Sequence, residues 1–254
     1  VYDSYKNNPK QFVDRINSYG LNKPLGLPIK GEGKPVIPQP GTNRWSGVAL
    51  PWMAFGYGLS VTPLQTLTLY NAVANDGVMV KPIFVSEIKE WNKTIKKYNT
   101  EVINPKICSQ ETLDKVQAVL ENVVKRGTGS KLYSKDFSMA GKTGTAQVNY
   151  KDKSKLYYAS SFVGYFPADE PKYSCIIVVH KPNVAAGYYG ADVAGPVFKR
   201  IAQKIFTDSP STNHVKNIDA KVVSQEKSYA EYYKKAEKEE RVVPNVKGDR
   251  KSTR

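Results

Sequence analysis

Apolar residues recur three and four positions apart in four stretches of the chain, and this spacing predicts amphipathic helices. The stretches open at residues that cap or start a helix, such as Asn8 followed by Pro9, or Thr62 followed by Pro63 with Gln65 completing a capping box. The pattern predicts helices over residues 9–19, 63–75, 110–126 and 196–206.

Three later stretches are rich in apolar, β-branched and aromatic residues, which predicts strands at residues 138–148, 160–167 and 173–181. The connections between them are short, so we expect antiparallel neighbours in one sheet. An alternating stretch at residues 82–91 also predicts a strand. Helices packed on an antiparallel sheet make the expected fold class α+β.

The polar run that carries most chemical information is Lys142-Thr143-Gly144-Thr145, inside the first of these three strands. Side chains two apart on a strand share a face, so Thr143 and Thr145 can present two hydroxyls to one carboxylate. Lys142 adds a positive charge beside them, and Gly144 lets a ligand lie against the backbone. The run predicts a carboxylate-binding strand; a polar strand end is the alternative reading.

Four further stretches accompany this run in a fixed order, namely residues 55–65, 127–130, 162–167 and 188–198. Together with Lys142-Thr143-Gly144, they resemble the transpeptidase domain of class B, monofunctional penicillin-binding proteins of the cell-division type, over about residues 1–206. The resemblance implies a penicillin-recognising serine transpeptidase/β-lactamase-like fold, incomplete at its N-terminus.

Such an enzyme needs a nucleophilic serine with a lysine one helical turn later. Of the two Ser-x-x-Lys strings, Ser86 to Lys89 lies in the predicted strand at 82–91, where positions three apart face opposite sides, and Ser224 to Lys227 follows Lys-Thr-Gly instead of preceding it. The string Ser211-Thr212-Asn213 follows it as well. We therefore expect a fragment that lacks the nucleophile and the Ser-x-Asn motif and is inactive alone.

The resemblance implies a mechanism for the intact parent. A serine attacks a D-alanyl-D-alanine stem peptide of peptidoglycan, and an amine of a neighbouring strand accepts the acyl group. Thr143 and Thr145 hold the terminal carboxylate, Lys142 supplies charge and sets the protonation of a second-motif serine, and the Thr145 N–H forms half of an oxyanion hole. Tyr57 and Tyr188 are candidates for lining the groove, or for plain packing.

Two other classes of function stay open. A serine β-lactamase relative would hydrolyse its acyl-enzyme, and a non-catalytic peptidoglycan-binding scaffold would need no nucleophile. The resemblance also implies β-lactam antibiotics as ligands, divisome membrane proteins as partners, and a parent anchored in the inner (cytoplasmic) membrane with this domain on its outer, periplasmic or extracellular, side.

After Phe206 the apolar periodicity fades. We expect residues 1–206 to be the C-terminal portion of the transpeptidase domain and residues 207–241 to be a charged linker. Residues 242–248, Val-Val-Pro-Asn-Val-Lys-Gly, resemble the first strand of a PASTA module, so residues 242–254 are expected to be its truncated start.

Composition narrows the partners. The net charge of +15 suits an anionic cell-wall or membrane surface, and since no nucleic-acid module is recognisable we expect no nucleic-acid partner. Cys108 and Cys175 stand far apart, and the histidines His180 and His214 form no ligand cluster, so we expect no disulfide framework, metal or cofactor.

Overall fold

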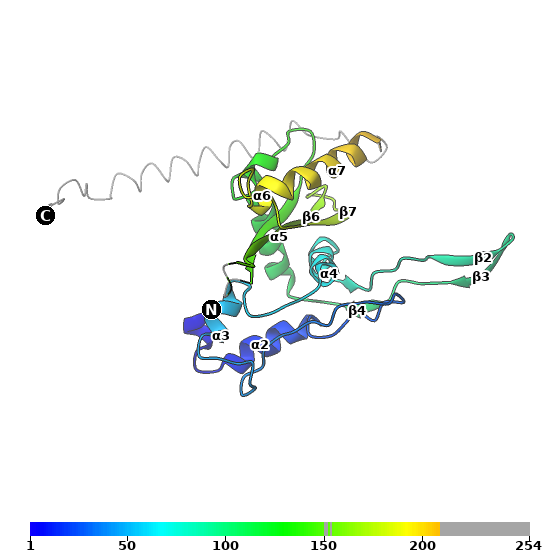
Figure 1. The fold of residues 1–254 in the computed structure, drawn as a ribbon. Helices are drawn as coiled ribbons and strands as arrows, with labels where there is room; N and C mark the ends of the chain where they lie inside the picture. The colour runs from blue at the N-terminus through cyan, green and yellow to red at the C-terminus, as the bar shows by residue number, and fades with distance from the viewer. Residues whose placement is uncertain (150–151, 153, 209–254) are drawn as a thin grey trace, which may run out of the picture. The chain divides into compact units, whose positions relative to one another are not determined.

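The computed structural model describes residues 1–149, 152 and 154–208 (Figure 1). The predicted linker and PASTA-like segment, apart from residues 207 and 208, lie outside the described residues. In chain order the elements are α1 (Tyr2–Tyr5), α2 (Pro9–Ser18), α3 (Ala49–Ala54), α4 (Pro63–Ala74), β1 (Met79–Val80), β2 (Glu87–Glu90), β3 (Lys93–Lys97), β4 (Val102–Asn104), α5 (Gln110–Lys125), the 3₁₀ turn η1 (Ser130–Leu132), β5 (Ala140–Val148), β6 (Tyr157–Phe166), β7 (Tyr173–His180), α6 (Gly190–Val193) and α7 (Gly195–Asp208).

The helix starts follow the predicted caps. The Asn8 side chain accepts the Gln11 N–H at the start of α2, and Ser109 accepts the Thr112 N–H at the start of α5. At α4 the capping box is complete, because the Gln65 N–H donates to Thr62 Oγ1 at 3.1 Å while Gln65 Oε1 accepts the Thr62 N–H at 2.9 Å. The four predicted helices are confirmed, and α7 continues two residues past the expected end at Phe206.

The predicted sheet is confirmed as three antiparallel strands in the order β5-β6-β7. The β5 and β6 register is unbroken from Ala140 opposite Tyr165 to Val148 opposite Tyr157. β6 therefore begins three residues earlier than the pattern predicted, since pairing with the far end of β5 extends the strand through Tyr157, Tyr158 and Ala159.

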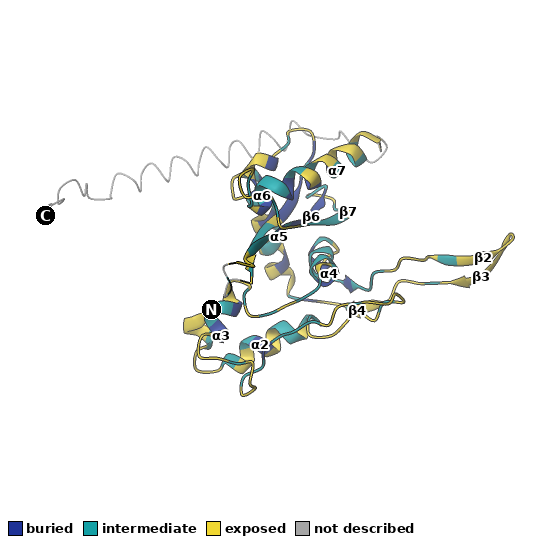
Figure 2. Cartoon of the chain, in the orientation of Figure 1, coloured by how far each residue is buried: buried dark blue, intermediate teal, exposed yellow. Residues whose placement is uncertain are grey.

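The strand predicted at residues 82–91 was wrong in length. Only Glu87–Glu90 is a strand, and it pairs with β3 in a separate two-stranded hairpin. Phe84, Val85 and Ile88 are exposed, as Figure 2 illustrates for this part of the chain. Alternation signals a half-buried strand only where a core covers one face, and neither buried cluster of the described residues includes a member of this stretch.

Two buried clusters pack on opposite faces of the sheet, because alternate residues of β6 point to opposite sides. Phe162 and Phe166 pack with Phe198 of α7 on one face. Tyr165 packs on the other face, in a cluster that α4 and the first turns of α5 complete, with Ala72 and Leu113 among its members. The sheet that carries Lys-Thr-Gly is therefore held from both sides.

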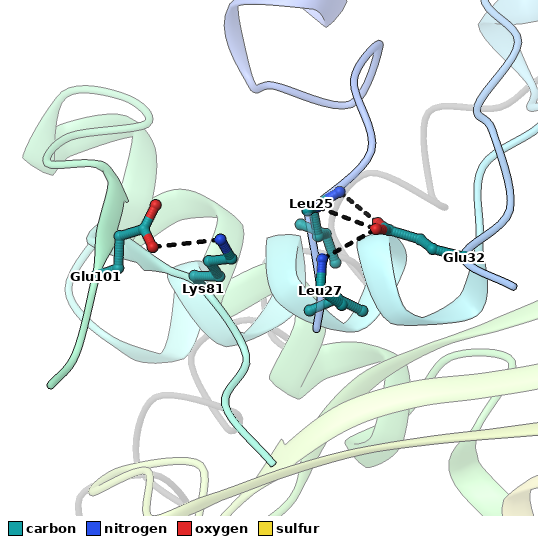
Figure 3. Close-up of polar contacts among 6 residues, drawn as sticks. Leu25, Leu27, Glu32, Lys81 and Glu101 are labelled. Carbon is teal, nitrogen blue, oxygen red and sulfur yellow. Dashed lines mark hydrogen bonds and ion pairs between the residues drawn. The ribbon is translucent and has the colours of Figure 1, made fainter. Parts of the chain in front are cut away.

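A loop before α3 is fixed by polar contacts (Figure 3). The Glu32 carboxylate accepts the backbone N–H groups of Leu25, Gly26 and Leu27, with the Gly26 bond at 3.0 Å. Three successive N–H groups converging on one carboxylate form an anion-binding concavity within the chain itself. Lys81 forms an ion pair with Glu101 at 3.3 Å, which joins the ends of β1 and β4.

Candidate active site

β5 lies at one edge of the described sheet, so one side of its backbone faces away from β6. The Gln147 N–H points to that outer side and donates to the Tyr57 hydroxyl at 2.9 Å. Tyr158, the partner of Gln147 on β6, turns its carbonyl the other way and accepts the Lys181 N–H at 2.9 Å. Gln147 and Tyr158 are therefore a pair without mutual backbone hydrogen bonds.

This pair sets the direction of the backbone groups along β5. The two kinds of pair alternate in an antiparallel ladder, and the register from Ala140 to Val148 has no bulge. The N–H and C=O groups of Thr143 and Thr145 therefore also point to the outer edge. A side-chain hydrogen bond is consistent with this direction, because the Lys142 ammonium donates to the Thr143 carbonyl at 2.9 Å.

The two threonine hydroxyls share one face of β5 and are each held by a second element. Thr143 Oγ1 lies 2.9 Å from Thr128 Oγ1 and 3.3 Å from Lys142 Nζ. Thr145 Oγ1 accepts the Gly190 N–H at 3.1 Å. A hydroxyl that accepts a hydrogen bond still has its own proton, so Thr145 Oγ1 remains able to donate to a ligand.

Thr128 is positioned by the two glycines on either side of it. A Cβ on Gly127 would lie 2.8 Å from Val123 Cα, so this segment folds back tightly on the last turn of α5. The Gly129 N–H bonds the Val123 carbonyl at 2.9 Å. The Gly-Thr-Gly sequence thus brings the Thr128 hydroxyl to the Lys-Thr-Gly strand.

The segment entering α6 is fastened to β5 and β6 at close range. A Cβ on Gly190 would collide with the Ser161 carbonyl and lie 2.6 Å from the Gly144 carbonyl. The fully buried Ser160 side chain donates to the Tyr188 carbonyl. A glycine is required here because the chain crosses directly over the peptide groups of the sheet.

Three tyrosines stand beside this crossing. The rings of Tyr158 and Tyr188 stack at 4.2 Å, and the Tyr188 hydroxyl donates to the Tyr189 hydroxyl at 3.1 Å. The hydrogen bond to the Tyr189 hydroxyl raises the pKa of Tyr188 to about 12. The tyrosines provide an aromatic wall.

The structure brings the four predicted residues, Lys142 to Thr145, together on one strand edge with Tyr57 at its far end. Sequence reasoning gave no role to Thr128 or Gly190, which hold the two hydroxyls. Both stand inside stretches of the sequence that resemble a known family, residues 127–130 and 188–198, and this resemblance is the signal that could have found them.

This architecture defines a class of protein. It is an α+β domain in which the Lys-Thr-Gly strand forms the edge of a sheet, and helices cover both faces of that sheet. The family model described as the penicillin binding protein transpeptidase domain matches residues 4–203, and the chain belongs to that family.

Named relatives and solved structures agree with this family assignment. The chain is 32% identical over 199 residues to the peptidoglycan D,D-transpeptidase FtsI of Buchnera aphidicola subsp. Baizongia pistaciae, covering 77% of this chain and 33% of that protein. It is 32% identical over 193 residues to the stage V sporulation protein D of Bacillus subtilis, covering 73% and 29%. The crystal structure of apo penicillin binding protein 3 from Mycobacterium tuberculosis superposes with a TM-score of 0.69 at 29% identity, covering 80% of this chain and 47% of that one.

The chain spans about a third of the length of these curated relatives. Among the described helices, none combines the length and apolar character needed to cross a membrane.

Proposed function

We propose that this chain is the peptide-binding part of a septal-type peptidoglycan D,D-transpeptidase. The observation that carries the proposal is the outer edge of β5, where the outward peptide groups of Thr143 and Thr145 stand beside two hydroxyls and the Lys142 ammonium. An edge strand offers backbone hydrogen bonds to an extended peptide, and the hydroxyls and ammonium suit a terminal carboxylate.

The reaction has two acyl transfers. A serine hydroxyl, which we assign to a part of the parent protein outside residues 1–254, attacks the carbonyl of the penultimate D-alanine of a stem peptide. The C–N bond breaks, the leaving D-alanine takes up a proton as its amine, and an ester remains on the serine. An amine of a neighbouring stem then attacks the ester, forms the cross-linking peptide bond and returns the proton to the serine.

The chain's own residues stabilise the charges of these steps. Thr143 and Thr145 donate their hydroxyl protons to the carboxylate, and Lys142 attracts it electrostatically. The Thr145 N–H points outward, where the carbonyl oxygen becomes negative in the tetrahedral intermediate, and serves as one donor of an oxyanion hole. Removing one such donor typically costs about 2.7 to 4 kcal/mol in the barrier.

The same edge would take β-lactams, whose strained amide stands in for the scissile peptide bond. In support, Mycobacterium tuberculosis penicillin binding protein 3, which this chain resembles, has been solved in complex with aztreonam and with ampicillin. A stable acyl-enzyme with a β-lactam distinguishes a transpeptidase from a β-lactamase relative, which would hydrolyse it. Absence of any acyl-enzyme would favour a peptidoglycan-binding scaffold.

The test is covalent labelling by a fluorescent penicillin on a denaturing gel, using the full gene product that carries this chain. We expect a stable label that Lys142→Ala slows by about 100-fold, the loss of one electrostatic contact to the transition state. Lys93→Ala, an exposed lysine on β3, is the matched control and should label like the wild type. A wild-type protein that takes no label contradicts the proposal.

We also propose the setting of this activity. The parent acts in the cell envelope, anchored in the cytoplasmic membrane with this domain on the outer side, and works with membrane proteins of the division machinery. In the same proposal, residues 1–206 form the C-terminal part of the catalytic domain, residues 207–241 a linker and residues 242–254 the start of a PASTA module. Support comes from the relatives' names and the sequence resemblance.

A further inference from the structure

Tyr57 is placed by the way in which α3 ends. The Gly56 N–H donates to the Met53 carbonyl at 3.1 Å, and the Tyr57 N–H donates to the Trp52 carbonyl at 3.0 Å. This pair of bonds, with Gly56 at φ +95°, is a Schellman motif. The motif is completed by its usual apolar contact, since the Tyr57 and Trp52 rings meet edge to face at 5.7 Å. The motif and the contact with Trp52 therefore fix where the Tyr57 side chain leaves the backbone and which way its ring points.

That direction leads to the outer edge of β5. The Tyr57 hydroxyl accepts the Gln147 N–H at 2.9 Å, and Gln147 is the next outward-pointing residue after Thr145. Positions that face the same side of a ladder are two residues apart, so an extended peptide bonded to Thr145 would meet Gln147 as its next partner. At that position the phenol ring already occupies the edge.

The proposed function sets which part of the peptide would reach Gln147. With the carboxylate at Thr143 and the reacting carbonyl at Thr145, the rest of the stem peptide runs toward Gln147. On this basis, which rests on the transpeptidase proposal, we propose that Tyr57 is a positioning residue that stops strand pairing after Thr145. The site then grips only the D-alanyl end of a peptide and turns the upstream residues away from β5.

If the Tyr57 ring stops strand pairing, removing the ring should change KM in a way that depends on the length of the donor peptide. We would assay Tyr57→Ala in the full gene product with two donor peptides, an N-acylated D-alanyl-D-alanine and the same peptide extended by three upstream residues. Without the ring, the extended peptide gains a hydrogen bond to the Gln147 N–H in both ground state and transition state. We expect its KM to fall about fivefold with kcat unchanged, and the KM of the short peptide to stay the same.

Two control variants test whether the effect comes from loss of the Tyr57 ring. Tyr57→Phe retains the ring, so it should keep the wild-type length dependence. Tyr133→Phe removes an exposed phenol at the end of η1, outside the residues assigned to the site, and should also behave as the wild type. If Tyr57→Ala merely damaged the loop, the KM values of both peptides would change alike. That outcome, or an unchanged KM for the extended peptide, contradicts the proposal that Tyr57 stops strand pairing.

Amide hydrogen exchange measured by NMR gives a readout that needs no catalysis. The Gln147 N–H should exchange at least fivefold faster in Tyr57→Phe than in the wild type, because its acceptor is gone. Equal exchange in the two proteins contradicts the inference. Absence of penicillin labelling in the wild type would instead overturn the transpeptidase proposal, so the two failures are distinguishable.

Discussion

Gln65 joins two parts of the chain that are far apart in sequence. It is 1% exposed, and its Nε2 donates to the Lys23 carbonyl at 2.7 Å and the Leu21 carbonyl at 3.4 Å. Its Oε1 caps α4 through the Thr62 N–H. One buried amide thus satisfies the helix start and the loop that follows α2, with both ends of the side chain used.

Replacing Gln65 with Leu should lower the free energy of unfolding by about 2 to 4 kcal/mol, since two carbonyls and one N–H lose their partner in a buried place. Urea unfolding followed by circular dichroism measures the change. Gln203→Leu, on an exposed position of α7, should shift the same value by less than about 0.5 kcal/mol. Equal effects of the two variants would show that the Gln65 contacts contribute nothing.

Tyr165 offers a second test at single-residue scale. It is 1% exposed, and none of the described residues hydrogen-bonds its hydroxyl. Tyr165→Phe should therefore stabilise the protein by about 1 kcal/mol, because an unsatisfied buried hydroxyl is removed. Tyr133→Phe, which changes an exposed ring, should leave the melting temperature unchanged.

The same tyrosine predicts a pH dependence. Burial, together with the charge of Glu121, raises the pKa of Tyr165 to about 12 from 10.0. The unfolded chain loses this proton first, so ionisation of Tyr165 has no effect on stability below pH 10 and lowers the stability of the wild type as the pH rises toward 12. Thermal melts of wild type and Tyr165→Phe between pH 9 and 12 should diverge in that window; parallel curves would refute the assignment.

At the scale of elements, α6 and β5 are coupled through Gly190. Gly190→Ala places a methyl group against the Ser161 and Gly144 carbonyls, so α6 must lift from the sheet and the Gly190 bond to Thr145 Oγ1 is lost. We expect a destabilisation of about 1 to 3 kcal/mol, measured by thermal unfolding, and slower penicillin labelling of the full gene product.

The matched control is Gly47→Ala, where an added Cβ meets nothing within 4 Å and the backbone needs no left-handed conformation. It should change neither the melting temperature nor the labelling rate. If Gly190→Ala is equally silent, the close approach of α6 to the sheet is not required.

Local rules were sufficient to predict most elements from the sequence. Asn8, Thr62 and Ser109 each bond an N–H of their own helix, so the starts of α2, α4 and α5 could be read within four residues. The exposed hairpin could not be read in this way. Whether an alternating stretch lies on a core depends on which distant segments cover it, and the sequence alone does not contain that information.

The candidate site likewise contains residues that the sequence predicts and residues that it does not. Lys142 to Thr145 were predicted because the run itself combines cation, hydroxyl and glycine. Gly190 and Thr128 reach the run from 45 and 15 residues away, through bonds to Thr145 and Thr143. No local spacing predicts such contacts; only the folded chain brings them together.

At the scale of the whole described molecule, the sheet is shared by two cores and should unfold as one unit. Phe198→Ala empties a buried position on one face, and Leu113→Ala does so on the other. We expect each to cost about 3 to 5 kcal/mol and to lower the midpoint of one common transition in calorimetry. A variant that splits the transition in two would mean that the faces fold independently.

The hairpin of β2 and β3 has a practical consequence for handling this protein. Its turn contains Trp91, which is 95% exposed with φ +53°, and no core residue belongs to either strand. An affinity tag, a fluorophore or a small reporter domain inserted between Trp91 and Asn92 would hang from a two-stranded stalk that takes no part in the peptide-binding edge. The hairpin is therefore a natural attachment point for imaging or immobilising the protein with the Lys-Thr-Gly strand left unmodified.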